Sequence, residues 1–228
     1  MKKLIAAALG LFCFTSAMAL DNEPKPGLTF QGQVGVDISN IRNSEYSAKA
    51  GANLGIYAQY MFEKAHGTYI MGGLNYAMKG NRKDLGICVN KNVLHYLQVP
   101  IHIGFQYNII PELGVFADFG PFFAVAPGGR GVFSFDDDTI GNHHYNILKN
   151  HHTGDYDLFN GLPELGFQRF DWGIGIRFGA EYNQHYSLNV AMDWGVEDIL
   201  RDTFRSTYAN VYPKYKTFNC AITLGYRF

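Results

Sequence analysis

Eight stretches of the sequence alternate apolar residues with small or polar ones at a period of two. The clearest is FDWGIGIRFGAEY, in which every second residue from Phe170 to Tyr182 is apolar. Successive side chains of a strand point to opposite faces, so each stretch predicts a β-strand with one apolar face. The stretches cover residues 28–38, 51–62, 69–80, 95–107, 113–125, 170–182, 186–196 and 218–228.

The contents of the two faces favour a membrane barrel over a soluble β-sandwich. A soluble sheet shows a charged face to water, whereas these polar faces carry isolated charges among many of the chain's 26 glycines. Aromatic residues end several apolar faces, as at Phe170 and Tyr182 or at Tyr186 and Trp194. An apolar outer band with aromatic girdles and a polar interior is typical of transmembrane β-barrels. The sequence therefore predicts an all-β, up-and-down antiparallel transmembrane barrel of about eight strands.

The connections between these stretches alternate in length. Those at 63–68, 108–112 and 183–185 are short, the others are longer, and 126–169 is the longest. Short periplasmic turns and long extracellular loops are typical of outer-membrane barrels. We therefore expect residues 20–228 to form one barrel domain, with 126–169 as a long extracellular loop. The last strand should close the barrel against the first, because lipid cannot satisfy an open sheet edge.

The N-terminus has the features of a secretory signal peptide. Lys2 and Lys3 precede an apolar run at 4–15, and Ala17-Met18-Ala19 provides a cleavage site. The run is too short to span a bilayer as a helix. We expect residues 1–19 to be cleaved and the remaining chain to be exported to the cell outer membrane.

The composition of the exported part excludes other classes of protein. It holds 17 basic and 20 acidic residues, which is no footprint for nucleic acid. Its two cysteines, Cys88 and Cys220, indicate no disulfide framework. No stretch calls for a cofactor, and no G-x-S-x-G motif is present. A catalytic triad assembled in space from outer-loop serines is the enzymatic alternative to a non-enzymatic barrel.

The C-terminus carries a second targeting feature. The chain ends on Phe228, preceded at the same face by Tyr226. A terminal aromatic residue resembles the signal read by the outer-membrane assembly machinery. The expected partners are therefore this machinery and outer-membrane lipid.

The predicted register turns a set of ionisable side chains toward the lumen. An eight-stranded barrel is just wide enough for its side chains to fill, so these residues predict a packed polar core. The short turn at 183–185 sets Arg177 opposite Ala191 and diagonal to Asp193, which predicts an Arg177–Asp193 ion pair. The alternative is a proton or ion path. The inward set is Asp37, Lys79, His102, Asp118, Asp171, Arg177, Glu181, Asp193 and Arg227.

Histidines gather in the longest predicted loop. Imidazoles beside the carboxylates of Asp136-Asp137-Asp138 form a candidate zinc or copper site. The alternative is a solvated, hydrogen-bonding loop. The four histidines are His143, His144, His151 and His152.

Five segments follow one another along the chain: LNYAMKG, YLQVPIHIGFQY, FADFGPFF, DWGIGIRFGAEY and LGYRF. This order is the one seen in small outer-membrane β-barrel proteins of the PorT-like type, and the chain resembles that family over nearly all of its exported part. One departure is Gln98, where the family often has Glu. Pro100 lies inside a strand that must pair on both sides, which predicts a bulge there.

These observations predict a non-enzymatic integral outer-membrane protein with a structural or surface-interaction role through its extracellular loops. Tyr145, Tyr156, Phe159 and Phe167 make the longest loop aromatic. Such a loop is suited to fold over the barrel mouth or to bind an extracellular ligand. A narrow porin-like channel for small solutes or ions is the first alternative. The resemblance alone implies the second, an accessory role in protein secretion or surface assembly.

Overall fold

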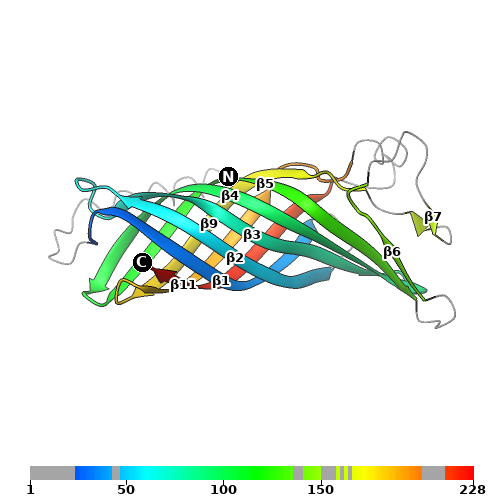
Figure 1. The fold of residues 1–228 in the computed structure, drawn as a ribbon, viewed down its shortest axis with the longest axis horizontal. Helices are drawn as coiled ribbons and strands as arrows, with labels where there is room; N and C mark the ends of the chain where they lie inside the picture. The colour runs from blue at the N-terminus through cyan, green and yellow to red at the C-terminus, as the bar shows by residue number, and fades with distance from the viewer. Residues whose placement is uncertain are drawn as a thin grey trace, which may run out of the picture.

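Eight long strands form a closed antiparallel ring in the computed structural model of the protein (Figure 1). The structure describes residues 24–42, 47–135, 141–149, 158–159, 162–163, 166–201 and 214–228. The ring consists of β1 (Gly27–Arg42), β2 (Ser47–Met61), β3 (Thr68–Asp84), β4 (Cys88–Ile110), β5 (Leu113–Phe135), β9 (Phe170–Tyr182), β10 (Tyr186–Gly195) and β11 (Lys216–Arg227). Three short strands lie outside the ring: β6 (Asn142–Tyr145) pairs with the end of β5, whereas β7 (Leu158–Phe159) and β8 (Leu162–Pro163) form a separate two-stranded sheet. This confirms the all-β, eight-stranded prediction.

The first and last strands close the ring. β11 lies antiparallel to β1 from Gln31 opposite Arg227 to Arg42 opposite Lys216. Beyond this ladder, the Phe228 backbone N–H donates to the Phe30 carbonyl at 2.9 Å. Each ring strand therefore has a neighbour on both sides, as the sequence predicts. We call the end with the three short turns and the C-terminus the turn end, and the other the loop end.

The first five strands of the ring are longer than predicted, whereas β9 has the predicted bounds. β4 and β5 each span 23 residues, whereas crossing a bilayer needs roughly 9–11. The extra residues lie at the loop end, where β3 and β4 are joined by only the three residues 85–87. The prediction of a longer loop there, and between β1 and β2, was wrong because both strands of each hairpin continue toward the connection.

The prediction of a loop over 126–169 was also wrong at its start. β5 continues past Val125 to Phe135, and residues 131–134 pair with β6. β7 and β8 form a small separate hairpin within the same predicted loop. Part of the segment is therefore an extension of the barrel sheet.

The bulge predicted at Pro100 is not found. The β3–β4 register is the same on both sides of it, with Gly72 opposite Ile101 and Asn75 opposite Gln98, and only the intervening pairs are missing. Since proline has no N–H to donate, the ladder is interrupted without an inserted residue. A register shift in β4 occurs instead between His95 and Leu97, on the side facing β5.

The outer surface of the ring is apolar along its middle. Five apolar side chains there are each 45–67% exposed: Leu54, Ile56, Ile101, Phe119 and Leu224. Aromatic rings gather at the turn end, where Tyr226 contacts both Tyr186 and Phe228. At the loop end Trp194 packs on Phe218, and the Trp172 indole donates to Glu197. These contacts form the two aromatic girdles that the sequence predicts.

No helix in the described ranges is long and apolar enough to cross a membrane.

Replacing Phe228 by Ser is expected to lower the amount of protein that reaches the outer membrane, because the terminal ring is the proposed assembly signal. Phe228 is 79% exposed and adds only its backbone N–H to the ladder, so the thermal stability of refolded protein should not change. Phe62→Ser removes another aromatic of the same girdle and serves as the control, with normal levels expected. Normal levels of Phe228→Ser would contradict the signal.

Candidate functional site: the polar interior and its outer cap

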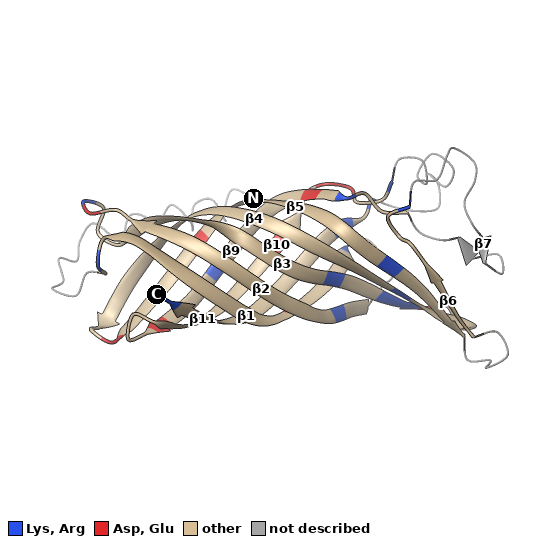
Figure 2. Ribbon diagram, in the orientation of Figure 1, with Lys and Arg blue, Asp and Glu red and all other residues tan. Residues whose placement is uncertain are grey.

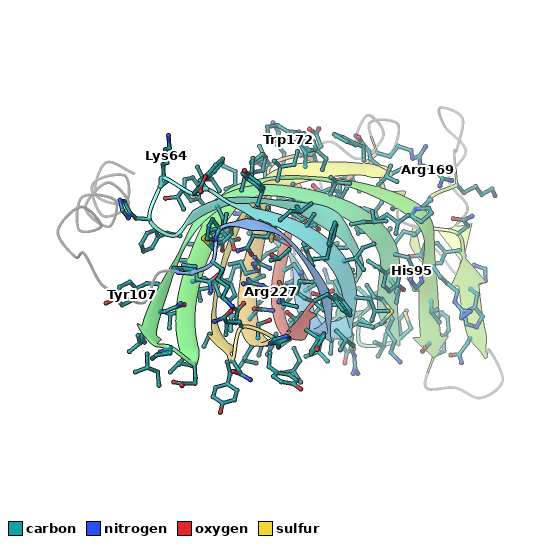
Figure 3. All side chains as sticks on the ribbon, turned by 60° about the vertical axis from the view of Figure 1, so that its left-hand side comes forward. Lys64, His95, Tyr107, Arg169, Trp172 and Arg227 are labelled. Carbon is teal, nitrogen blue, oxygen red and sulfur yellow. The ribbon has the colours of Figure 1, made fainter. Side chains whose placement is uncertain are left out.

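The nine side chains predicted to face the lumen all lie inside the ring. Eight of them are at most 7% exposed, and the Arg227 side chain is 11% exposed. Figure 3 shows Arg227 within the ring and Trp172 on its outer surface. Asparagines and glutamines surround them, and the amide side chains that are at most 8% exposed are Gln31, Gln33, Asn53, Gln59, Asn75, Asn81, Asn90, Asn92, Gln98, Gln106, Asn108, Asn189 and Asn219.

Asp118 is the centre of the middle layer of this interior. It lies directly opposite Arg177 in the β5–β9 ladder, and the guanidinium contacts its Oδ2 at 2.8 Å and 3.0 Å. The Tyr69 hydroxyl donates to the same oxygen at 2.6 Å, and His102 Nδ1 lies 2.7 Å from Oδ1. The buried carboxylate is therefore neutralised by one cation and fully engaged by hydrogen bonds.

The predicted Arg177–Asp193 pair was wrong. Asp193 accepts a hydrogen bond from the Gln98 side chain at 3.0 Å instead. Arg177 points across to Asp118 on β5, and the rings of Phe116 on β5 and Tyr57 on β2 lie 5.2 Å and 5.6 Å from its guanidinium carbon. Arg177 pairs with Asp118 on β5 because Asp118 is its direct register partner, whereas Asp193 on β10 is only diagonal to it.

Glycines make room for this cluster. A Cβ at Gly104 would approach the Tyr69 ring and the Asp118 Cβ to 2.5 Å. A Cβ at Gly175 would approach Asp193 Oδ1 to 2.6 Å. The glycines on the polar faces therefore let large side chains fill a narrow lumen.

A second ion pair lies nearer the turn end. Arg227 contacts Glu181 at 2.7 Å and 2.9 Å, and Gln106 donates to the same carboxylate at 3.0 Å. The Gln59 carbonyl oxygen accepts from Arg227 at 3.2 Å. This layer joins β2, β4, β9 and β11 and neutralises both of its charges.

The layer nearest the loop end contains one cation among several carboxylates. The Lys79 ammonium lies 4.9 Å and 5.1 Å from the ring centroids of Phe122 and Tyr96, and among the described residues its Nζ has no hydrogen-bond partner. Asp37 and Asp171 lie within its electrostatic range. A cavity of about 10 Å³ beside Lys79 has room for one water molecule.

The carboxylates of this layer are held by neutral donors. Asp37 accepts from Asn53 and Asn219 at 3.0 Å and 2.9 Å, and Asp171 accepts from Thr217 at 2.6 Å. In this layer, amide and hydroxyl groups from other strands donate the hydrogen bonds to the carboxylates, whereas in the middle layer an arginine does so.

Beyond Lys79 the inward side chains are mainly apolar, apart from the buried amides of Asn81, Asn90 and Asn92. Loop residues cover this end, and we call them the outer cap: Ile147, Leu148, Phe167, Ile199, Leu200 and Tyr215. The cap packs on inward side chains of β4 and β5, including Leu94, Tyr96, Phe122 and Phe133. All of these side chains are at most 3% exposed. The loop end of the lumen is thus filled by a hydrophobic core.

Backbone hydrogen bonds fix the cap. The Phe167 N–H donates to the Ile147 carbonyl, and the Ile199 N–H donates to the Tyr215 carbonyl, at 2.8 Å and 2.9 Å. The Arg201 guanidinium donates to the carbonyls of Leu148 and Phe167. Four separate stretches of chain, at 147–148, 167, 199–201 and 215, are held in this way above one end of the barrel.

The histidine cluster is only partly within the described residues. His143 lies 6.4 Å from the ring centroids of both Phe133 and Tyr145, which stack directly on each other, whereas His144 lies opposite Val132 on the other face of β6. These two imidazoles therefore do not face one ion together. His151 and His152 lie outside the described residues, and elsewhere in the described part no group of three metal-ligating side chains is found.

Sequence reasoning missed the aromatic partners of the inner charges and most of the cap residues, although it singled out Phe167 in a loop suited to fold over the mouth. Tyr57, Tyr69 and Phe116 stand at inward positions of their strands, so the period of two contained that signal. The cap residues lie in irregular segments, where no periodicity indicates which side chains turn inward.

A closed ring with an apolar outer band, two aromatic girdles and a packed polar interior defines a transmembrane β-barrel of the outer-membrane class. The sequence agrees, because residues 4–228 match the family described as outer membrane protein beta-barrel domain. The chain belongs to this family. The turn end is accordingly periplasmic and the loop end extracellular.

Solved structures of low sequence identity are similar to the chain. They include Ail, the attachment invasion locus protein of Yersinia pestis (13% identity, TM-score 0.42, covering 90% of this chain and 100% of that one). OprG from Pseudomonas aeruginosa is 14% identical, with a TM-score of 0.45 and coverages of 91% and 99%. Neisserial surface protein A is 9% identical, with a TM-score of 0.43 and coverages of 89% and 97%. No curated protein sequence matches the chain significantly.

The Arg177→Leu variant is expected to lower the free energy of unfolding by about 3–5 kcal/mol, because it leaves the Asp118 carboxylate buried without a cation. A double-mutant cycle in urea identifies the partner. Combination with Asp118→Asn should recover much of the loss, while combination with Asp193→Asn should be additive. Coupling to Asp193 instead of Asp118 would contradict the observed pairing.

Proposed function

We propose that this protein is a closed, non-enzymatic outer-membrane barrel whose extracellular end is an interaction surface. The observation that carries the proposal is the outer cap. The cap fills the loop end of the lumen with apolar side chains. A channel would need a water-filled opening at that place. The polar interior beneath the cap then stabilises the barrel and does not conduct.

Burial along the lumen supports a closed barrel. Glu181, Asp118 and Asp37, one in each layer, are at most 2% exposed, and the other charged side chains of the lumen are at most 7% exposed except Arg227 at 11%. A path wide enough for water would expose the groups that line it. In the middle layer and in the layer nearer the turn end, the charges also neutralise one another locally, as a structural core requires.

The length of the sheet supports an extracellular role. At about 3.3 Å per residue and a tilt near 40°, the 23 residues of β4 rise roughly 58 Å, against a hydrocarbon core of about 30 Å. The strands therefore project well beyond the membrane. An ordered sheet raised in this way is a rigid support for loops that bind an extracellular ligand.

The narrower resemblance to PorT-like barrels, and with it a role in secretion or surface assembly, rests on the ordered sequence segments alone. Gln98, where that family often has Glu, donates to Asp193 inside the barrel. A Glu there would place two carboxylates together, so the departure changes the chemistry of the lumen.

Purified, refolded protein is expected to show no single-channel openings in a planar bilayer. The native Cys88 offers an independent test, because it is 2% exposed within the hydrophobic core of the mouth. A positively charged methanethiosulfonate reagent should not label Cys88 in the folded barrel.

The control for labelling is Ile87→Cys in a Cys88→Ser background, since Ile87 is 63% exposed beside it and should react. Steady openings would overturn the proposal in favour of a narrow channel. A silent bilayer with rapid labelling of Cys88 would show that water passes the cap and would overturn its role as the seal.

A further inference from the structure

Two basic side chains face each other directly on the outside of the barrel. Arg82 on β3 is the register partner of Lys91 on β4, and both point outward. Like charges directly opposite one another destabilise a sheet unless something neutralises them. A third cation, Arg130 on β5, lies opposite Val93 and hence diagonal to Lys91. We call Arg82, Lys91 and Arg130 the basic strip.

Within the described ranges the protein supplies little negative charge to the basic strip. Among the described residues none of the three has a hydrogen bond or ion pair, and the charge of Lys91 acts repulsively on Lys49. The nearest carboxylate along β3 is Asp84, whose Oδ1 accepts a hydrogen bond from the Gly86 N–H. Figure 2 shows the Lys and Arg positions side by side on the ends of the strands that lead to β6.

The level of the basic strip follows from the apolar belt beneath it. On β4 the outward residues from Ile103 to Leu97 are apolar and 40–45% exposed. The belt ends at His95, whose Nδ1 lies 2.6 Å from the Tyr76 hydroxyl in a polar, stacked pair suited to an interface. Lys91 is four residues further on, which corresponds to a rise of about 10 Å. That rise places the three cations at the headgroup layer of the outer leaflet.

We propose that the basic strip binds the phosphate groups of anionic lipid headgroups in the outer leaflet. The strip continues the lipid-facing surface upward, so the lipid whose chains cover the belt also presents its headgroup there. Guanidinium groups match phosphate oxygens in charge and geometry, and Lys91 adds a point charge between them. Bound phosphate also removes the repulsion between Arg82 and Lys91.

The test compares urea unfolding of refolded protein in vesicles of phosphatidylcholine alone and of phosphatidylcholine with lipid A. Wild type should gain roughly an order of magnitude in its folded-to-unfolded ratio from lipid A, in proportion to the basic residues near the anionic surface. Arg82→Gln/Lys91→Gln should lose most of that gain. In phosphatidylcholine alone the same variant should be at least as stable as wild type, because the like-charge pair is gone.

Lys25→Gln/Lys64→Gln removes two exposed charges at the periplasmic end and is the matched control, with the full gain expected. Arg130→Gln leaves Arg82 and Lys91 in place and should lose part of the stabilisation by lipid A. It replaces the double variant in the test if that variant does not fold. An equal gain in all variants would overturn the proposal. So would an equal gain of wild type from inorganic phosphate in phosphatidylcholine vesicles, which would indicate a free-anion site.

Discussion

Backbone hydrogen bonding in lipid is the constraint on which the rest of this structure depends. No N–H or C=O group can be left open to hydrocarbon, so the sheet has to close on itself. The β1–β11 ladder, twelve residue pairs long, is the closure. Once the ring is closed, the period of two divides every strand into a lipid-facing and a lumen-facing half. The apolar belt and the polar interior both follow from that division.

The narrow lumen then decides how its charges are arranged. Eight strands enclose about enough space for their own side chains, so each buried charge has to find its partner inside the protein. Asp118 and Glu181 are neutralised by arginines, while Asp37 relies on two asparagine amides. A glycine on one strand leaves space for an aromatic ring from another strand, as Gly104 does for Tyr69. The polar interior is thus packed as other proteins pack a hydrophobic core.

The parts of this fold that were predictable from the sequence are those in which lipid enforces the pattern. All eight membrane strands were located, because an apolar face must be continuous within the bilayer. Outside the bilayer that requirement ends, and residues 126–135 with Gly128-Gly129 read as a loop although they continue β5. The prediction of Asp193 as the partner of Arg177 was wrong for another reason. A three-residue turn fixes the β9–β10 register, whereas β5 and β9 are joined by a long segment that gives no register.

The extension of β4 and β5 links the proposed seal to the proposed lipid contacts. Both strands are far longer than membrane crossing requires, so their outer thirds must be maintained by something other than lipid. On the inner face, Leu94 and Phe133 pack in the hydrophobic core that fills the mouth. On the outer face of the same two strands, three residues before Leu94 and Phe133, lie Lys91 and Arg130. Because adjacent residues point to opposite sides, one extended sheet can close the lumen and hold the headgroup layer at once.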